Sequence, residues 1–169
     1  MSKRNYIRTY FYRIDARGRL YHDGTEQNDA GFLDFFFKRV EPNDTGEYPE
    51  YPYISPCGKE MNFIRSAGTP LVFKDLISDG SSLIYGATLT VPFRPEELRR
   101  GSDDQLYHPA PFAVGRIHPE LLLRWQDFLD FDEDWIIRPD GPFSSLGGPL
   151  SIAKLSPDLD EIARIQEER

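Results

Sequence analysis

The chain has 169 residues with 28 acidic and 20 basic side chains, which gives a formal net charge of −8 at pH 7. This acidic balance argues against nucleic-acid binding, which needs a basic surface, and the single cysteine excludes an internal disulfide and a multi-cysteine metal site. Hydrophobic residues make up 39% of the chain, so a packed core is expected, and the length favours one domain over residues 1–169.

The sequence contains no candidate membrane or targeting segment. No stretch approaches the roughly 20 apolar residues of a spanning helix. No apolar signal-peptide core follows the basic residues Lys3, Arg4 and Arg8. These features predict a cytoplasmic protein that does not interact with membranes.

The first third of the chain predicts a β-hairpin followed by a helix. Residues 9–14 and 19–23 are rich in aromatic and β-branched side chains and flank a polar turn. Asn28 or Asp29 is placed to cap a helix over residues 29–40. The apolar residues of this segment fall on one helical face, as in a helix that packs on a core: Phe32, Leu33, Phe36, Phe37 and Val40.

From residue 51 onward the pattern changes to short extended segments: 51–54, 61–65, 71–77 and 83–93. The alternation through 83–93 predicts one strand with an apolar face. Together these elements predict an α+β fold, with a mostly antiparallel, curled sheet, the aromatic-rich 29–40 helix on one face and a C-terminal helix. We expect the helix to pack Phe32, Leu33, Phe36 and Phe37 against Leu83, Tyr85, Leu89 and Val91.

The C-terminal third is less regular. Residues 118–131 fit either a helix that starts near Pro119 or an extended segment, and periodicity does not decide between them. Nine of the thirteen residues in 139–151 are Gly, Pro or Ser, which predicts a loop or lid. Ser156 and Pro157 are the expected cap and first residue of the last helix.

Cys57 lies in the sequence Ser-Pro-Cys-Gly at residues 55–58, whose residue types suit a type I turn. We therefore expect Cys57 near a hairpin tip. As a nucleophile or redox thiol it would need a nearby cation, such as Lys59 or Arg65, to stabilise the thiolate. The favoured alternative is a small residue that fills a tight turn.

Three polar residues follow Cys57. In a strand, Glu60 and Asn62 share one face and Arg65 points to the other. Arg65 is a candidate clamp for a carboxylate or phosphate, because its guanidinium donates paired hydrogen bonds. A structural ion pair or a turn brace is the favoured alternative.

His108 lies between Tyr107 and Pro109 in the sequence Leu-Tyr-His-Pro-Ala-Pro. The prolines restrict this segment to extended backbone and would hold the imidazole as a general base, although a histidine bonded to backbone is the favoured alternative. The three histidines lack metal-binding spacing, and the acidic run 127–134 lacks that of a calcium loop, so no metal site is expected. Nucleotide-binding and hydrolase motifs are also absent, and no cofactor is predicted.

Several blocks resemble Uncharacterised Protein Family 0598: YFY at residues 10–12, FFF at 35–37, SPCG at 55–58, VPF at 91–93 and LYHPAP at 106–111. Their order matches that family over residues 8–117, and Glu60, Asn62, Phe63 and Arg65 belong to the same pattern, whereas residues 118–169 diverge from it. The family has bacterial members and animal members that look mitochondrial. The resemblance implies a bacterial-type member, and it implies no activity or cofactor.

Three functions fit these observations. The favoured one is a non-enzymatic module that binds a small ligand or a protein partner through a tyrosine-rich surface, because tyrosine combines an apolar ring with a hydroxyl group. The expected binding residues are Tyr51, Tyr53, Tyr107, Glu60, Asn62 and Arg65. An enzyme with Cys57 as nucleophile and His108 as base is the second hypothesis. The third is a homo-oligomer, such as a homodimer, held by exposed aromatic residues.

Overall fold

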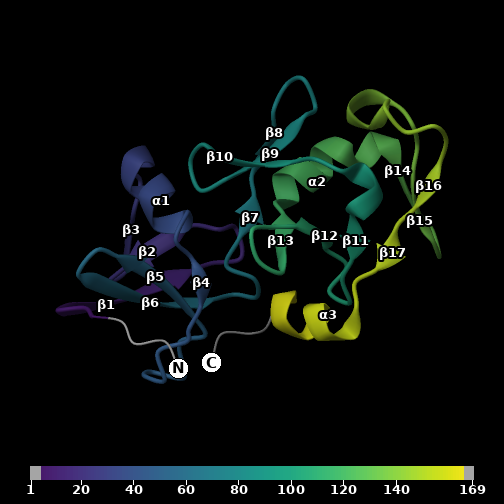
Figure 1. Ribbon diagram of the computed structural model, residues 1–169. Coiled ribbons are helices and arrows are strands. Elements are labelled where there is room, and N and C mark those ends of the chain that lie inside the picture. The colour runs from purple at the N-terminus through teal and green to yellow at the C-terminus, as the bar shows by residue number, and fades with distance from the viewer. Residues whose placement is uncertain (1–4, 166–169) are drawn as a thin grey trace.

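The structure, a computed structural model, describes residues 5–165. Helices and strands are mixed along this part of the chain, and the strands form four open sheets (Figure 1). Most neighbouring strands are antiparallel. The structure therefore confirms the predicted α+β class with an antiparallel-rich sheet arrangement.

The first sheet has the strand order β3-β2-β1-β6-β5-β4, and its central pair, β1 and β6, is parallel. Its strands are β1 (Arg8–Ile14), β2 (Leu20–His22), β3 (Thr25–Glu26), β4 (Glu41–Pro42), β5 (Tyr53–Cys57) and β6 (Glu60–Ser66). The predicted N-terminal hairpin is β1 and β2. Asp15 closes its turn, since its carboxylate accepts the backbone N–H groups of Arg17 and Arg19, each at 2.9 Å.

The helix α1 (Ala30–Phe37) begins as predicted, because the Asp29 carboxylate accepts the Phe32 N–H at 2.8 Å. It ends three residues before the predicted end at residue 40. Phe36 and Phe37 are buried. The eight side chains that were expected to pack together all belong to one hydrophobic cluster.

The second sheet contains β8 (Asp75–Leu76), β9 (Ser82–Tyr85) and β10 (Leu89–Pro92). The single strand predicted over 83–93 is wrong, because β9 and β10 form an antiparallel hairpin. Gly86 opens the turn with a positive φ of 62°. Asp34 of α1 holds the turn from outside, and its carboxylate accepts the backbone N–H groups of Ala87 and Thr88 at 2.9 and 2.8 Å.

The third sheet has the order β17-β11-β12-β13-β7, with parallel pairs at both of its edges. Its strands are β7 (Val72–Phe73), β11 (Arg99–Arg100), β12 (Leu106–Pro109), β13 (Val114–Ile117) and β17 (Ala153–Lys154). A short 3₁₀ turn, Pro95–Glu97, precedes β11. The fourth sheet consists of β14 (Leu129–Phe131), β15 (Trp135–Ile137) and β16 (Leu150–Ser151).

Residues 118–131 combine the two structures that the sequence left open. They form α2 (Pro119–Trp125), then a 3₁₀ turn (Gln126–Phe128), and then β14. The His118 imidazole caps α2 by accepting the Glu120 N–H at 3.0 Å. The 139–151 segment is mostly loop, with a 3₁₀ turn (Gly141–Phe143), and α3 (Pro157–Ala163) begins at the predicted proline.

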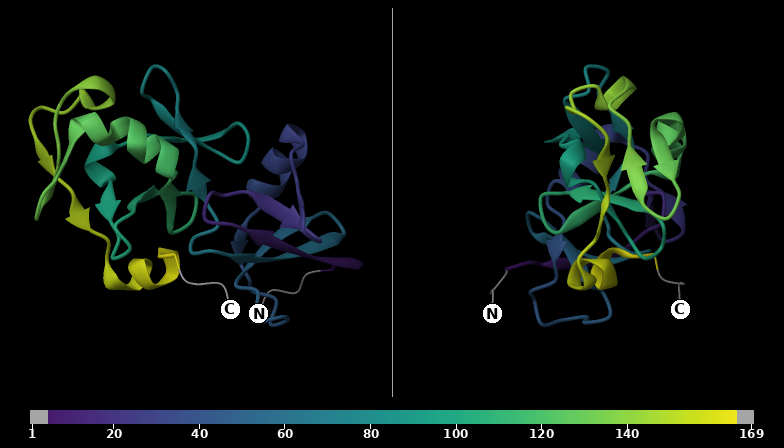
Figure 2. Two further views of the ribbon diagram at one scale, coloured as in Figure 1. Left: turned by 180° about the vertical axis from the view of Figure 1, so that it is seen from behind. Right: turned by 90° about the vertical axis from the view of Figure 1, so that its right-hand side faces the viewer.

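The first sheet and α1 lie at one end of the molecule, and α2 with the fourth sheet lies at the other (Figures 1 and 2). Arg116 of β13 joins the two parts. It is fully buried, and its guanidinium donates to the carbonyl oxygens of Ala67, at 3.4 Å, and Ala16. Among residues 5–165, no helix has the length and hydrophobicity needed to cross a membrane.

Candidate functional site

Cys57 is the last residue of β5 and pairs in register with Glu60. The reversal therefore lies at Gly58 and Lys59, two residues later than a type I turn over 55–58 would place it, so that turn prediction is wrong. Gly58 permits the tight reversal because its φ is 62°. The thiol is half-buried, and its Sγ lies 3.6 Å from the Ser55 hydroxyl oxygen.

His108 lies on β12 of the third sheet and is 2% exposed. Its Nε2 accepts the Arg94 backbone N–H at 3.1 Å, and its Nδ1 lies 2.8 Å from the Pro109 carbonyl oxygen, to which it donates. Burial lowers the pKa of this imidazole. Because backbone groups occupy both ring nitrogens, the structure gives no support to a Cys57–His108 catalytic pair.

Glu60, Asn62 and Cys57 lie on one face of the first sheet, because alternate residues of paired strands point the same way. Arg65 lies on the opposite face, where its guanidinium stacks 4.6 Å from the centre of the Tyr51 ring. Its position is that of a cation–π contact rather than of a free anion clamp.

The tyrosines expected at a binding surface do not form a common surface. Tyr53 is 7% exposed, and its ring packs on Phe112. Tyr107 is fully buried in another cluster, and its hydroxyl donates to Asp103 at 2.5 Å. Burial and the Asp103 carboxylate raise the pKa of Tyr107. Both rings therefore stabilise the core, which corrects the expected tyrosine surface.

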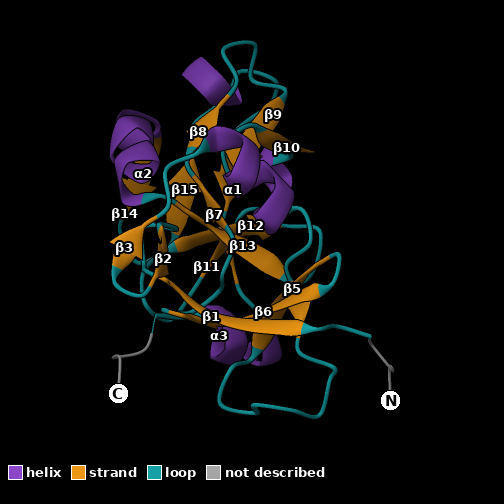
Figure 3. Cartoon of the chain, turned by 90° about the vertical axis from the view of Figure 1, so that its left-hand side faces the viewer, coloured by secondary structure: helices purple, strands orange, loops and turns teal. Residues whose placement is uncertain are grey.

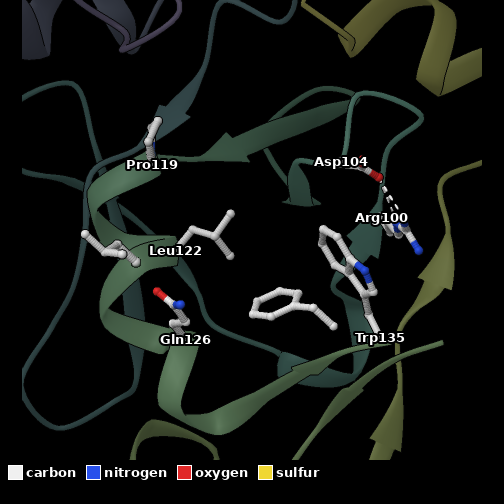
Figure 4. A pocket seen from close by; sticks show the side chains of 8 residues that line it. Arg100, Asp104, Pro119, Leu122, Gln126 and Trp135 are labelled. Carbon is white, nitrogen blue, oxygen red and sulfur yellow. Dashed lines mark hydrogen bonds and ion pairs between the residues drawn. The ribbon is translucent and has the colours of Figure 1, made fainter. Parts of the chain in front are cut away.

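A hollow of about 440 Å³ opens between α2 and the β14–β15 hairpin, with the turn after β11 at its rim. Figure 4 shows the side chains of Leu122 and Trp135 facing each other across it, with Gln126 on the α2 side. We call this hollow the α2 groove. It is lined by Arg100, Asp104, Pro119, Leu122, Leu123, Gln126, Phe131 and Trp135.

The wall of the α2 groove combines aromatic rings with a single cation. The rings of Phe131 and Trp135 meet edge to face with centres 4.9 Å apart. The Arg100 guanidinium lies 4.3 Å from the centre of the Trp135 ring. Its Nη2 donates to Asp104 Oδ1 at 2.7 Å, and its Nε donates to the same oxygen at 3.2 Å. This arrangement suits an apolar molecule with an anionic end.

None of the groove residues was identified from the sequence. Leu122 was visible only within the undecided 118–131 segment, and Phe131 and Trp135 flank acidic side chains that suggested a solvated surface. Arg100, on β11, gave no signal at all. Within residues 5–165, no group of three or more His, Cys, Asp or Glu side chains is arranged to hold a metal ion.

Comparison with known proteins identifies the family and the fold. Residues 1–140 match the family described as "Domain of unknown function (DUF4505)", so the chain belongs to this family. Two solved structures of bacterial DUF1285 family proteins are similar in fold. The protein from Shewanella baltica OS155 has a TM-score of 0.52 at 16% identity, over 70% of this chain and 91% of that one. The protein from Silicibacter pomeroyi DSS-3 has a TM-score of 0.57 at 13% identity, over 89% of this chain and 83% of that one.

Proposed function

We propose that this member of the DUF4505 family is a binding module whose α2 groove holds a small molecule with an apolar body and a carboxylate. The groove volume of about 440 Å³ lies within the usual range of small-molecule sites. Its two ionisable lining residues, Arg100 and Asp104, are paired with each other, which favours recognition over proton transfer.

The position of Arg100 carries this proposal. The Trp135 ring holds the guanidinium at the edge of an apolar slot, and Asp104 engages it through one carboxylate oxygen only. The Asp104 side chain is 67% exposed, so it is free to move into solvent. A ligand carboxylate would replace it with two parallel hydrogen bonds, the geometry that guanidinium groups prefer.

Intrinsic fluorescence tests the proposal, because the chain has only two tryptophans. In a Trp125→Phe variant the signal comes from Trp135 alone. We expect octanoate to change this signal with a dissociation constant at least about ten-fold below that of octanol, since hydrogen bonds to charged groups contribute about 1.5–3 kcal/mol. Equal responses to the two compounds, or no response, would contradict the proposal.

Substitutions in the ion pair separate binding from nonspecific effects. Arg100→Gln should abolish the preference for octanoate. Asp104→Asn should strengthen octanoate binding several-fold, because it removes the competing carboxylate. Arg94→Gln is the matched control, since Arg94 is exposed and does not line the groove. If the groove recognised apolar groups only, none of these substitutions would change its affinity for octanoate.

We further propose that the family relation extends to Uncharacterised Protein Family 0598, supported by the SPCG and LYHPAP blocks, and that the protein acts in the cytoplasm without binding nucleic acid. Alignment of the two families and cell fractionation test the first two points.

A homodimer is a second candidate function, favoured by the exposed side chains of Leu123 and Phe131 at the groove. A strict monomer in sedimentation at high concentration would exclude it.

A further inference from the structure

A second cluster of polar side chains lies on the first sheet, on the face that α1 covers in part. The strand register aligns Tyr10 of β1 with Asn62 of β6 and Ser55 of β5 in one row across the sheet. The adjacent row contains Arg8, Glu60 and Cys57. Because these residues alternate along their strands, all six point to the same face.

The helix α1 closes one side of this cluster. The Ser55 hydroxyl donates to the Phe36 carbonyl oxygen at 2.7 Å, and the Tyr12 ring packs on Phe36 with centres 4.8 Å apart. The sheet end that carries the β5–β6 turn extends beyond α1 (Figures 1 and 3). Tyr10, Cys57 and Glu60 are consequently half-buried rather than covered.

Asn62 at the centre of the cluster contains a hydrogen-bond acceptor that is not satisfied. The side chain is 2% exposed, and its Nδ2 donates to the Ser55 carbonyl oxygen at 2.9 Å. This bond fixes the orientation of the amide, since the carbonyl oxygen only accepts. Its Oδ1 is buried and has no partner. A buried acceptor of this kind is costly, so the position favours a molecule that brings a donor.

The neighbours of Asn62 favour a cation. Glu60 supplies a carboxylate, and its present partner, Arg8, is 3.6 Å away and mostly exposed. Tyr10 and Tyr12 supply aromatic rings that flank His22. Burial raises the pKa of Tyr12, and the neighbouring Glu60 carboxylate raises it as well, which is the direction expected beside a negative charge.

We propose that this face binds a primary amine whose ammonium group donates to Asn62 Oδ1 and to the Glu60 carboxylate and lies against the Tyr10 ring. An ammonium group has three donors and no acceptor, which matches a cluster of acceptors, and aromatic rings attract cations. This site is separate from the α2 groove and does not depend on the function proposed there.

Cys57 is the only thiol in the chain, so its alkylation rate reports on this face. With iodoacetamide at constant pH and ionic strength, butylammonium should slow the alkylation of Cys57 several-fold in a saturable manner. Butanol, which has the same chain length and no charge, should not. Butylammonium should also leave the Trp135 signal unchanged, which keeps this test distinct from that of the groove.

Variants assign the protection to the proposed contacts. Glu60→Gln and Asn62→Leu should each raise the half-protecting butylammonium concentration at least ten-fold, whereas Arg8→Gln should lower it by removing a competing cation. Glu133→Gln is the control, because Glu133 is exposed in the turn between β14 and β15. Glu60 is half-exposed, so its variant keeps the test valid even if Asn62→Leu fails to fold.

Three results would overturn the proposal. These are equal protection by butanol, no protection at saturating butylammonium, and protection that Glu60→Gln leaves unchanged. The second result would mean that the Asn62 amide has a structural role only.

Discussion

His108 illustrates how burial determines the role of a single residue. Its imidazole is neutral in the folded chain, because burial lowers its pKa and its Nε2 accepts a backbone N–H. The unfolded chain has an ordinary histidine pKa near 6.5, so below that pH it binds more protons than the folded chain does. Stability is therefore retained above about pH 6.5 and is lost as the pH falls below it.

Urea unfolding between pH 7.5 and 5.5 measures this effect. We expect the free energy of unfolding to decrease toward the lower pH, by at most about 1.4 kcal/mol per pH unit for each proton. His108→Gln should reduce the slope. His118 should account for part of the remainder, because burial also lowers its pKa. A wild-type stability that is constant over this range would contradict the assignment of a buried neutral imidazole.

The candidate residues could be predicted only where local sequence determines their position. Glu60 and Asn62 share a face as predicted, because they alternate along one strand. Cys57 joins them through its pairing with Glu60, which the predicted turn over 55–58 did not give. His108 and Tyr107 lie in a different sheet, and no local pattern encodes the distance between sheets. The unsatisfied hydrogen-bond acceptor Oδ1 of Asn62 could not be predicted from the sequence either, since the lack of a donor depends on which groups surround the amide in three dimensions.

Elements were predictable where periodicity and capping agree. The helix α1 has both. The contact of Asp34 with the β9–β10 turn could not be predicted in this way, because the backbone N–H groups that it accepts lie 53 and 54 residues away in the chain. The alternation of apolar and polar residues over 83–93 fits one long strand. It fits equally well a hairpin in which both strands turn their apolar side chains to the same face. The only local signal for the turn was the glycine at position 86, a residue type that readily adopts the positive φ that the structure shows there.

The face of α1 gives a prediction with an adjacent control. Phe36 is 0% exposed and Phe35 is 45% exposed, although both are phenylalanines on the same helix. Phe36→Ala should lower the free energy of unfolding by about 3–5 kcal/mol, the usual effect of removing a large core side chain. Phe35→Ala should lower it by less than about 1 kcal/mol, since that ring is largely exposed and lies against the Arg39 guanidinium. Similar losses in denaturant melts would show that the buried face is assigned wrongly.

At the scale of the whole molecule, the first sheet is joined to the later part of the chain by buried polar contacts. Arg116 donates to carbonyl groups that follow β1 and β6, and the Thr69 hydroxyl donates to the Val114 carbonyl oxygen at 2.7 Å. Gly68 lies so close to α3 that an added Cβ would be 2.4 Å from the Ala163 carbonyl oxygen. Neither part could separate without breaking these hydrogen bonds and exposing the buried contact surfaces to water.

We therefore expect residues 1–169 to unfold as one unit, which is the single-domain organisation that the chain length predicts. Both tryptophans lie in the later part of the chain, and Cys57 lies in the first sheet, so a dye on Cys57 and tryptophan fluorescence report on opposite ends. Their urea transitions should share one midpoint and one slope, because loss of the first sheet exposes Arg116 and its partners in the same step. The tryptophan transition of unlabelled protein controls for an effect of the dye. A dye signal that changes at a lower urea concentration than tryptophan fluorescence would mean that the first sheet and α1 unfold independently.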